Sequence, residues 1–316
     1  MDASGTAAVE RERSALMGLA YRMLGTVADA EDAVQEAFLR WYRLTDEERA
    51  AIVVPGAWLM RTASRICLDT LGSARARRES YVGEWLPEPV PSDALFARGP
   101  ADPLDRAALD ESVSTALLLL LETLTPAERV VLVLHDVFAV PFDEIAGIVG
   151  RSSAACRQLA SSGRRRIREG RRGEPASRER HDELVQAFAA ACASGSLDGV
   201  VAVLDAEAVL RSDGGGFVSA ALRPVRGAEN VARFVLGLMS KWPDAEVLPV
   251  VTPDGLALAA EQDGTITTLV GVGVADGRIT DVWIMRNPHK LTLWTGSGPG
   301  AGAGLGAADS DTPPRR

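Results

Sequence analysis

At 316 residues, with 47% hydrophobic and 24% charged residues, the chain has the composition of a globular protein of two or three domains. No long uncharged apolar run occurs, so a membrane span is not expected, and the N-terminus lacks the basic and apolar regions of a secretory signal. Cys67, Cys156 and Cys192 form no CxxC pair and no zinc spacing, so we expect reduced thiols, a cytoplasmic location, and no metal or cofactor.

The net charge of −9 is unevenly distributed along the chain. Residues 151–172 contain eight arginines against the single acidic residue Glu169. Residues 181–295 contain fourteen acidic residues against eight Lys and Arg. A segment that attracts phosphates therefore precedes an acidic C-terminal third, which would repel nucleic acid and could hold the basic segment in check.

The first 82 residues are predicted to form a helical domain. Between Asp29 and Tyr42, apolar residues recur at three- and four-residue steps, which indicates an amphipathic helix. The opposite face carries Asp29, Asp32 and Glu36, and it is either a solvated acidic face or a docking surface for a basic partner. Pro55 is typical of the start of another helix, which is basic and aromatic and therefore suited to hold unstacked single-stranded bases. Its candidate residues are Trp58, Arg61, Arg65, Arg75, Arg77 and Arg78.

Prolines and glycines mark residues 83–105 as a linker, extended in part. Helices are predicted again from about Pro103 to residue 171, in a second domain over 106–173. Within it, Thr125 is expected to cap a helix that has Pro126 at its first position.

A helix-turn-helix is predicted inside this second domain. A buried helix around residues 130–137 precedes a short helix at 141–149, Gly150 supplies a tight turn, and Ser152 or Ser153 caps an arginine-rich helix. The alternative is a helical hairpin with a solvated basic face. In the DNA-binding interpretation, Arg157 and Gln158 reach base edges in the major groove and the later arginines neutralise phosphates. The candidate residues are Ser152, Ser153, Arg157, Gln158, Ser161, Arg164, Arg165 and Arg168.

The pattern changes over residues 174–295. Helices are predicted at about 178–194 and 227–240, followed by strands at Glu246–Thr252, Leu256–Gln262, Thr265–Val274 and Arg278–Met285 with Asp-Gly turns between them. Apolar segments that alternate with Asp-Gly turns are typical of β-hairpins. The tail over 296–316, rich in Gly, Ala and Pro, is predicted to be disordered.

Three segments in this order resemble the extracytoplasmic-function sigma factors. They are DAEDAVQEAFLRWY, AWLMRTASRICLDTL and LTPAERVVLVLHDVFAVPFDEIAGIVG. The resemblance implies two all-α sigma domains, namely a region 2 helical bundle and a region 4 helix-turn-helix. It also implies that the acidic helix binds the β′ clamp helices of the RNA polymerase core. The next helix would then open and read the −10 element of promoter DNA, and region 4 would read the −35 element.

Further motifs resemble those of the sigma-factor group with a fused SnoaL-like domain. They are Trp85-Leu86-Pro87-Glu88-Pro89, Asp213-Gly214-Gly215-Gly216 and Asn287-Pro288-His289-Lys290-Leu291. That domain is similar to the nuclear-transport-factor-2-like cone, an α+β fold with a curved sheet around a pocket. Phe217 and His289 stand where the family usually has a basic residue and Asp, so the charge pairing of these two positions is not expected here.

Two functions follow for the C-terminal domain. SnoaL-type cyclases use acid/base chemistry, and Asp213, Trp283 and His289 are candidates for it, although turn and loop roles suit Asp213 and His289 better. The favoured hypothesis is a non-enzymatic alternative sigma factor whose own C-terminal domain modulates it, with a small-molecule ligand as one candidate signal. The alternative is a polyketide-cyclase-like enzyme fused to a DNA-binding module.

In the favoured hypothesis the linker docks into the mouth of the cone. The sequence does not indicate whether this docking activates or inhibits the sigma factor. The candidate interdomain residues are Trp85, Leu86, Pro87, Asp213, Gly214, Gly215, Gly216, Asn287, Pro288 and Lys290.

Overall fold

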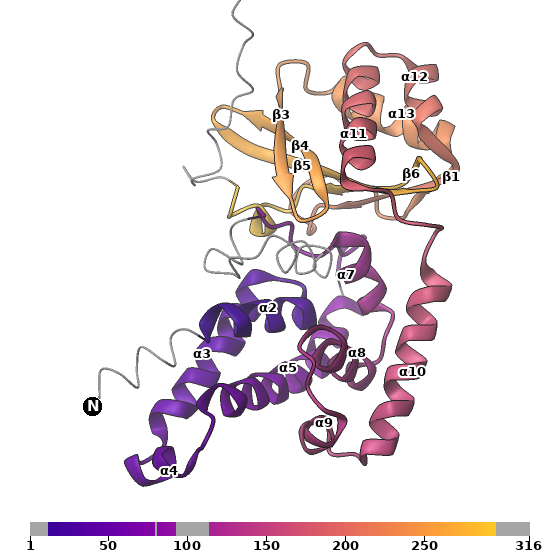
Figure 1. Ribbon diagram of the computed structural model, residues 1–316. Coiled ribbons are helices and arrows are strands. Elements are labelled where there is room, and N and C mark those ends of the chain that lie inside the picture. Colours follow the sequence, from indigo (N-terminus) through magenta and orange to yellow (C-terminus); the bar gives the residue numbers. More distant parts are fainter. Residues whose placement is uncertain (1–11, 80, 93–113, 295–316) are drawn as a thin grey trace, which may run out of the picture.

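The computed structural model describes residues 12–79, 81–92 and 114–294, without the side chains of 74–79. Two helical units lie below an α+β domain in Figure 1. No helix of the described segments is long and apolar enough to cross a membrane. The linker residues beyond 92, the start of the second helical domain and the predicted tail lie outside the described residues.

The first helical unit, which covers the expected region 2 and is called so below, consists of α2 (Arg13–Leu24), α3 (Val27–Arg43), α4 (Asp46–Ala51) and α5 (Pro55–Glu79). Gly25, at φ 78°, ends α2 in the left-handed conformation that glycine tolerates. Thr26 caps α3 by accepting from the Asp29 amide. The predicted apolar stripe of α3 is buried, including Ala30, Val34 and Ala37 at 0% exposure, so this face packs against α2 and α5.

The second helical unit, region 4, consists of α7 (Thr115–Glu122), α8 (Pro126–Leu132), α9 (Phe142–Val149) and α10 (Ser153–Gly170). Thr125 and Glu128 form a reciprocal capping box at the start of α8. The helix that continues from α8 widens to a π-helical turn over Val133–Val137. Gly150, at φ 69°, makes the predicted tight turn, and Ser152 rather than Ser153 caps α10. The helix-turn-helix geometry expected from the sequence is therefore present.

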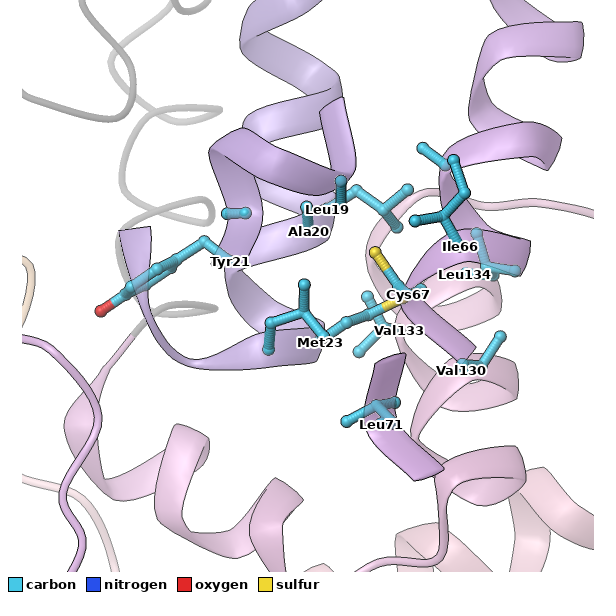
Figure 2. Packing of buried hydrophobic residues seen from close by; sticks show 14 of the residues in the cluster. Leu19, Ala20, Tyr21, Met23, Ile66, Cys67, Leu71, Val130, Val133 and Leu134 are labelled. Carbon is cyan, nitrogen blue, oxygen red and sulfur yellow. The ribbon is translucent and has the colours of Figure 1, made fainter. Parts of the chain in front are cut away.

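The two helical units share one apolar core. Figure 2 shows Met23, Ile66 and Cys67 of α2 and α5 beside Val133 and Leu134, which follow α8. All five side chains are at most 9% exposed. The units are therefore packed against one another along α5.

Two arginines hold this packing with hydrogen bonds to backbone carbonyls of the other unit. Arg129 of α8, 2% exposed, donates from Nη1 to the Met23 carbonyl at 2.7 Å and pairs with Glu122. Arg65 of α5 donates to the Gly147 carbonyl of α9 at 2.7 Å. Both carbonyls lie at or near helix C-termini, where they have no partner within their own helix. Regions 2 and 4 thus form a closed pair.

The C-terminal domain is a mixed sheet covered by helices on one face. Its elements are α11 (Arg178–Ala193), α12 (Leu197–Val203), β1 (Leu204–Asp213), β2 (Val225–Arg226), α13 (Ala228–Met239), β3 (Glu246–Thr252), β4 (Gly255–Gln262), β5 (Thr265–Ala275), β6 (Arg278–Met285) and the 3-10 helix η2 (Pro288–Lys290). The strand order is β2-β1-β6-β5-β4-β3, with β1 and β6 parallel and the other pairs antiparallel. The four strands predicted from Asp-Gly turns are present, whereas β1, β2 and α12 were not predicted.

Alternate residues of these strands face two different environments. Leu258, Val272 and Ile284 pack under the three helices with Val185 and Phe188 in one apolar cluster. The opposite face presents a second cluster, which includes Leu86 of the linker. Its buried members are Leu86, Ala257, Leu269, Trp283, Met285 and Leu291. The linker therefore lies on the sheet face away from the helices, where it contacts both segments that were expected to receive it, Asp213–Gly216 and Asn287–Leu291. It does not enter the space between the sheet and the helices, because that space is filled by side chains of the domain.

Candidate interdomain and nucleic-acid interfaces

The carboxylate of Asp213, at the end of β1, joins the C-terminal domain to the segment 81–92. This segment follows α5 and begins two residues before the predicted linker boundary at 83, and it is called the linker from here on. Asp213 is 0% exposed. Oδ1 accepts from the Tyr81 hydroxyl at 2.6 Å and the Gly215 amide at 2.9 Å. Oδ2 accepts from the Leu86 amide at 3.0 Å and Lys290 Nζ at 2.8 Å. Asp213 does close its own glycine turn, but the turn interpretation was incomplete, because the same carboxylate holds two linker residues.

Lys290 completes this arrangement from η2. Its Nζ, on a residue 6% exposed, donates to the Leu86 carbonyl at 2.6 Å and lies 4.3 Å from the centre of the Trp85 ring. The backbone N–H and C=O of Leu86 are thus both bound, one by each member of a buried ion pair. A buried charge pair of this kind is costly to break, because the remaining charge has no solvent to compensate it. We call Asp213, Lys290 and the Leu86-contacting cluster Ala257, Leu269, Trp283, Met285 and Leu291 the linker site.

The glycine loop and the 287–291 segment fit one another closely. Gly215 has φ 64°, and a Cβ there would lie 2.4 Å from Asn287 Nδ2, so both its backbone angle and its space require glycine. Asn287 Nδ2 donates to the Tyr81 hydroxyl at 2.8 Å. Gly214 is crowded by the Val218 carbonyl, Gly216 faces Val82 of the linker, and Pro288 is exposed at the start of η2. Burial, followed by the hydrogen bond to Asp213, raises the pKa of Tyr81, which keeps its hydroxyl a donor.

Phe217 and His289, the two departures from the family pattern, contact each other. Their ring centres are 4.5 Å apart, and both residues are exposed. A ring contact therefore stands where the family has opposite charges, and the charge pair of this region lies deeper, between Asp213 and Lys290.

The other side of the linker is bound to region 2. Glu88, 4% exposed, accepts from the Val27 amide at the start of α3 through Oε2 at 2.8 Å. Its amide donates to the Gly25 carbonyl at 2.9 Å, and its carbonyl accepts from the Tyr21 hydroxyl at 2.6 Å. Burial raises the pKa of the Glu88 carboxyl, against the stabilising Val27 amide. The linker is thus bound on both sides, by region 2 and by the C-terminal domain.

A separate contact joins the C-terminal domain to region 4. Asp254, in the β3–β4 turn, accepts from the Thr115 amide at 3.0 Å and from the Thr115 hydroxyl at 2.7 Å, at the N-terminus of α7. A carboxylate there satisfies free helix amides and the helix dipole. Sequence reasoning missed this contact and those of Tyr81, Glu88 and Trp294, whose Nε1 donates to the Pro89 carbonyl at 2.8 Å. The Asp-Gly turn at 254 was seen, but its partner lies 139 residues away.

The three acid/base candidates do not form a catalytic set. The Asp213 carboxylate already accepts four hydrogen bonds from the protein, so none of its acceptor sites is free to take a proton from a substrate. His289 is exposed and contacts the Phe217 ring at a tilt of 50°, while Trp283 is buried in the cluster that contains Leu86. Beside Leu86, Pro87 and Trp283 lies a cavity of about 30 Å³, which suits water rather than an aromatic substrate.

On α10 the predicted DNA-reading residues divide into two groups. Arg157, Gln158, Ser161, Arg165 and Arg168 are exposed, and their spacing places them along one side of the helix. Arg164 is also exposed, but it pairs with Asp136 through two hydrogen bonds, of 2.8 and 2.5 Å, so the phosphate contact predicted for it would compete with this carboxylate.

The acidic partners of the α10 arginines come from region 4 itself. Besides Asp136, they are Glu128, bound by Arg166 at 2.7 Å, and Glu169, 3.9 Å from Arg165. Among the described residues, no ion pair joins α10 to the acidic C-terminal domain, so the hypothesis that this domain neutralises the basic helix is not supported by any contact.

The predicted −10 residues of α5 are also unequal. Trp58 is half-buried, and its ring contacts Trp41 edge-on at 5.4 Å, while Arg61 is exposed. Arg65 is used in the contact with α9. The side chains of Arg75, Arg77 and Arg78 lie outside the described residues. Exposed Leu39, Tyr42, Val53 and Val54 lie in the neighbouring segments of region 2 and were missed, because single exposed apolar residues carry no sequence pattern.

The acidic face of α3 is open to solvent in part. Asp32 is exposed, Glu36 is bonded to Arg40 of the next turn at 2.8 Å, and Asp29 accepts from the Thr26 hydroxyl at 2.7 Å. In Figure 1, α3 starts beside α2 and runs along the outer side of region 2 toward α4, away from the C-terminal domain.

Two helical units, one with a helix-turn-helix and an exposed basic helix, define a DNA-binding transcription factor. The sigma-70 region 2 family matches residues 8–77, and the sigma-70 region 4 family matches residues 114–167. The chain is 40% identical over 298 residues to ECF RNA polymerase sigma factor SigJ of Mycobacterium tuberculosis, covering 90% of this chain and 92% of that protein. It is 34% identical over 294 residues to the probable ECF RNA polymerase sigma factor SigI of the same organism, covering 90% and 94%. The chain therefore belongs to the extracytoplasmic-function (ECF) RNA polymerase sigma factors.

A solved structure agrees over nearly the whole chain. The crystal structure of SigJ from M. tuberculosis superposes with a TM-score of 0.70 at 38% identity and covers 91% of this chain and 98% of that one. The expected fold class, two all-α sigma domains followed by an α+β domain, is confirmed. The chain is an alternative sigma factor that directs RNA polymerase to promoter DNA.

Proposed function

We propose that the C-terminal domain keeps this sigma factor closed by binding the linker between regions 2 and 4. The observation that carries the proposal is the buried Asp213 carboxylate, which accepts from Tyr81 and Leu86 of the linker and from Lys290 of its own domain. On this account the domain boundaries are 1–82, 83–105, 106–173 and 174–295, and the domain acts in place of a separate inhibitory protein.

The closed arrangement opposes promoter recognition for a geometric reason. The −10 and −35 elements are about 25 base pairs apart, which is roughly 85 Å at about 3.4 Å per base pair. Here Arg65 of the −10 helix is bonded to Gly147 in the helix-turn-helix, and α10, with eighteen residues, is only about 27 Å long. The two readers cannot reach both elements until regions 2 and 4 separate. Release of the linker is therefore the activating step, which gives the interdomain contact an inhibitory sign.

Leu86→Asp tests this proposal. A carboxylate cannot enter the apolar cluster without a large desolvation penalty, so the linker should leave its site. With core polymerase and promoter DNA, we expect severalfold more promoter-specific transcript than from the wild type. Val247→Asp, the introduction of the same charge at a 46% exposed position of β3 that does not contact the linker, is the control and should behave as wild type. Equal transcript from all three proteins would contradict the proposal.

We further propose that the acidic face of α3 binds the β′ clamp helices of the polymerase core. Replacing Asp32 and Glu36 by Lys reverses two charges on a face whose opposite side forms the core, so the fold should persist. Affinity for core polymerase should fall at least tenfold, measured by binding to immobilised core at two salt concentrations. Unchanged affinity of the folded variant would refute this assignment.

The exposed side of α10 is proposed to read the −35 element with divided roles. Arg157→Ala, near the start of the helix, should cost about 1–3 kcal/mol and relax base preference, as for a base-edge contact. Arg168→Ala should weaken binding evenly across sequences and reduce the salt slope by about 1, as for a phosphate contact. Fluorescence anisotropy with matched and mismatched promoters separates the two, and identical behaviour would show the division to be wrong.

A further inference from the structure

The contacts of the linker site are made to the backbone of its occupant. Asp213 binds the N–H of Leu86, Lys290 binds its C=O, and Trp294 binds the C=O of Pro89. These contacts read an extended chain and not particular side chains. The linker side chain that enters the apolar cluster of this site is Leu86, at 1% exposure. Binding of backbone groups together with one apolar pocket is a general mode of peptide recognition.

The linker does not fill this site completely. The cavity of about 30 Å³ lies against Leu86, Pro87 and Pro89 on one side and against Trp283 and Met285 on the other. Trp283 is 5% exposed, and its Nε1 has no hydrogen-bond partner among the described residues. The space left in the pocket means that another occupant can gain packing contacts that the linker lacks.

A cation–π contact extends the recognition to the residue before the leucine. The Lys290 ammonium lies 4.3 Å from the centre of the Trp85 ring and 5.2 Å from that of Tyr81. The prolines that follow restrict the chain to an extended form, so an occupant of the same pattern loses little conformational entropy when it binds. The site therefore selects an internal chain segment of the pattern aromatic-Leu-Pro-x-Pro.

We propose that the linker site is a peptide-binding site, and that a segment of another protein with the pattern aromatic-Leu-Pro-x-Pro competes with the linker and opens the sigma factor. This inference rests on the proposed function, since it names the partner that would release the linker. The linker has the advantage of being part of the same chain, which gives it an effective concentration in the millimolar range. A competitor therefore binds poorly until the linker is weakened or the competitor fits the site better.

The test uses the full-length chain and a fluorescent peptide with the sequence of residues 81–91, acetylated and amidated at its ends. Fluorescence anisotropy should show at least tenfold tighter binding to the Leu86→Asp protein than to the wild type. Binding should be lost when the peptide carries aspartate in place of its leucine, and when the protein carries Asp213→Asn as well. A second peptide starts at the leucine and has a free amine, and it tests whether the site accepts a chain end in place of an internal segment. It should bind more weakly than the full peptide, because it lacks the aromatic residue.

A second measurement guards against misfolding of the Leu86→Asp protein. Excess of the same peptide should raise promoter-specific transcription by the wild-type protein, and the aspartate peptide should not. Equal binding of the 81–91 peptide and the aspartate peptide would overturn the inference. So would a failure of the 81–91 peptide to bind the Leu86→Asp protein together with no effect of this peptide on transcription by the wild type. The proposed function is tested separately, because it predicts higher transcription by Leu86→Asp with no peptide present.

Discussion

Asp213→Asn is expected to release the linker and to raise promoter-specific transcription. Each carboxylate oxygen accepts from two donors, so an amide group in either orientation sets its own NH₂ against donor groups. The change also leaves the Lys290 ammonium without its counter-charge in a buried position. Losing one partner of a buried ion pair costs about 3–5 kcal/mol, which is enough to shift a docked linker to mostly undocked.

The control for this variant is Glu229→Gln. Glu229 is exposed on α13 and pairs only with Arg233 one turn away, so its loss should change stability little and transcription not at all. Transcription with core polymerase and the circular dichroism of both variants should be measured together. If the folded Asp213→Asn protein transcribed no more than wild type, Asp213 would be a structural residue of the C-terminal domain and not part of a switch.

Trp85→Ala and Gly215→Ala are expected to act in the same direction and not additively. The first removes the ring beside Lys290, an interaction worth about 0.5–2 kcal/mol. The second places a Cβ 2.4 Å from Asn287 at a φ of 64°, so the loop must move away from Tyr81 and Asp213. Because both disrupt the same docked state, the double variant should gain less than the sum of the single effects, with a coupling energy of about 0.5–3 kcal/mol.

Transcript yield and linker docking should both be measured for this cycle, the latter as protection of the 81–92 backbone in hydrogen exchange. Gly237→Ala on α13, where a Cβ meets nothing within 4 Å, is the control for a glycine substitution. Strictly additive effects, or no effect of Trp85→Ala on transcription, would leave the C-terminal domain without this role.

The sequence was informative wherever structure depends on local pattern. The 3.6-residue spacing in α3, the Thr125-Pro126 start of α8 and the Gly150 turn each have a short-range cause, and all are present. The same holds for strands β3 to β6, whose Asp-Gly turns are local signals. By contrast, β1 has no clean alternation, because Ala208, Val209 and Leu210 are all buried between neighbouring strands and packed layers.

What the sequence could not reveal depends on distant partners. Asp213 looked like a turn residue because the two linker groups that donate hydrogen bonds to its carboxylate, on Tyr81 and Leu86, lie more than 120 residues away in the sequence. Arg164 and Arg65 looked free to bind DNA because no residue near them in the sequence pairs with them. In the structure Arg164 binds the Asp136 carboxylate, and Arg65 binds the Gly147 carbonyl. The two segments that receive the linker were predicted, but the sheet face on which it lies was not, since that depends on which face the three helices already cover.

The distance between regions 2 and 4 in the free protein tests the central claim most directly. Labels at Glu47→Cys in α4 and Glu169→Cys in α10 report it, because both positions are exposed and the three native cysteines are buried. Single-molecule energy transfer should give one short, narrow distance for the wild type and a longer, broad distribution for the Asp213→Asn variant. A free wild-type protein with widely separated regions, or a variant with an unchanged distance, would contradict the account.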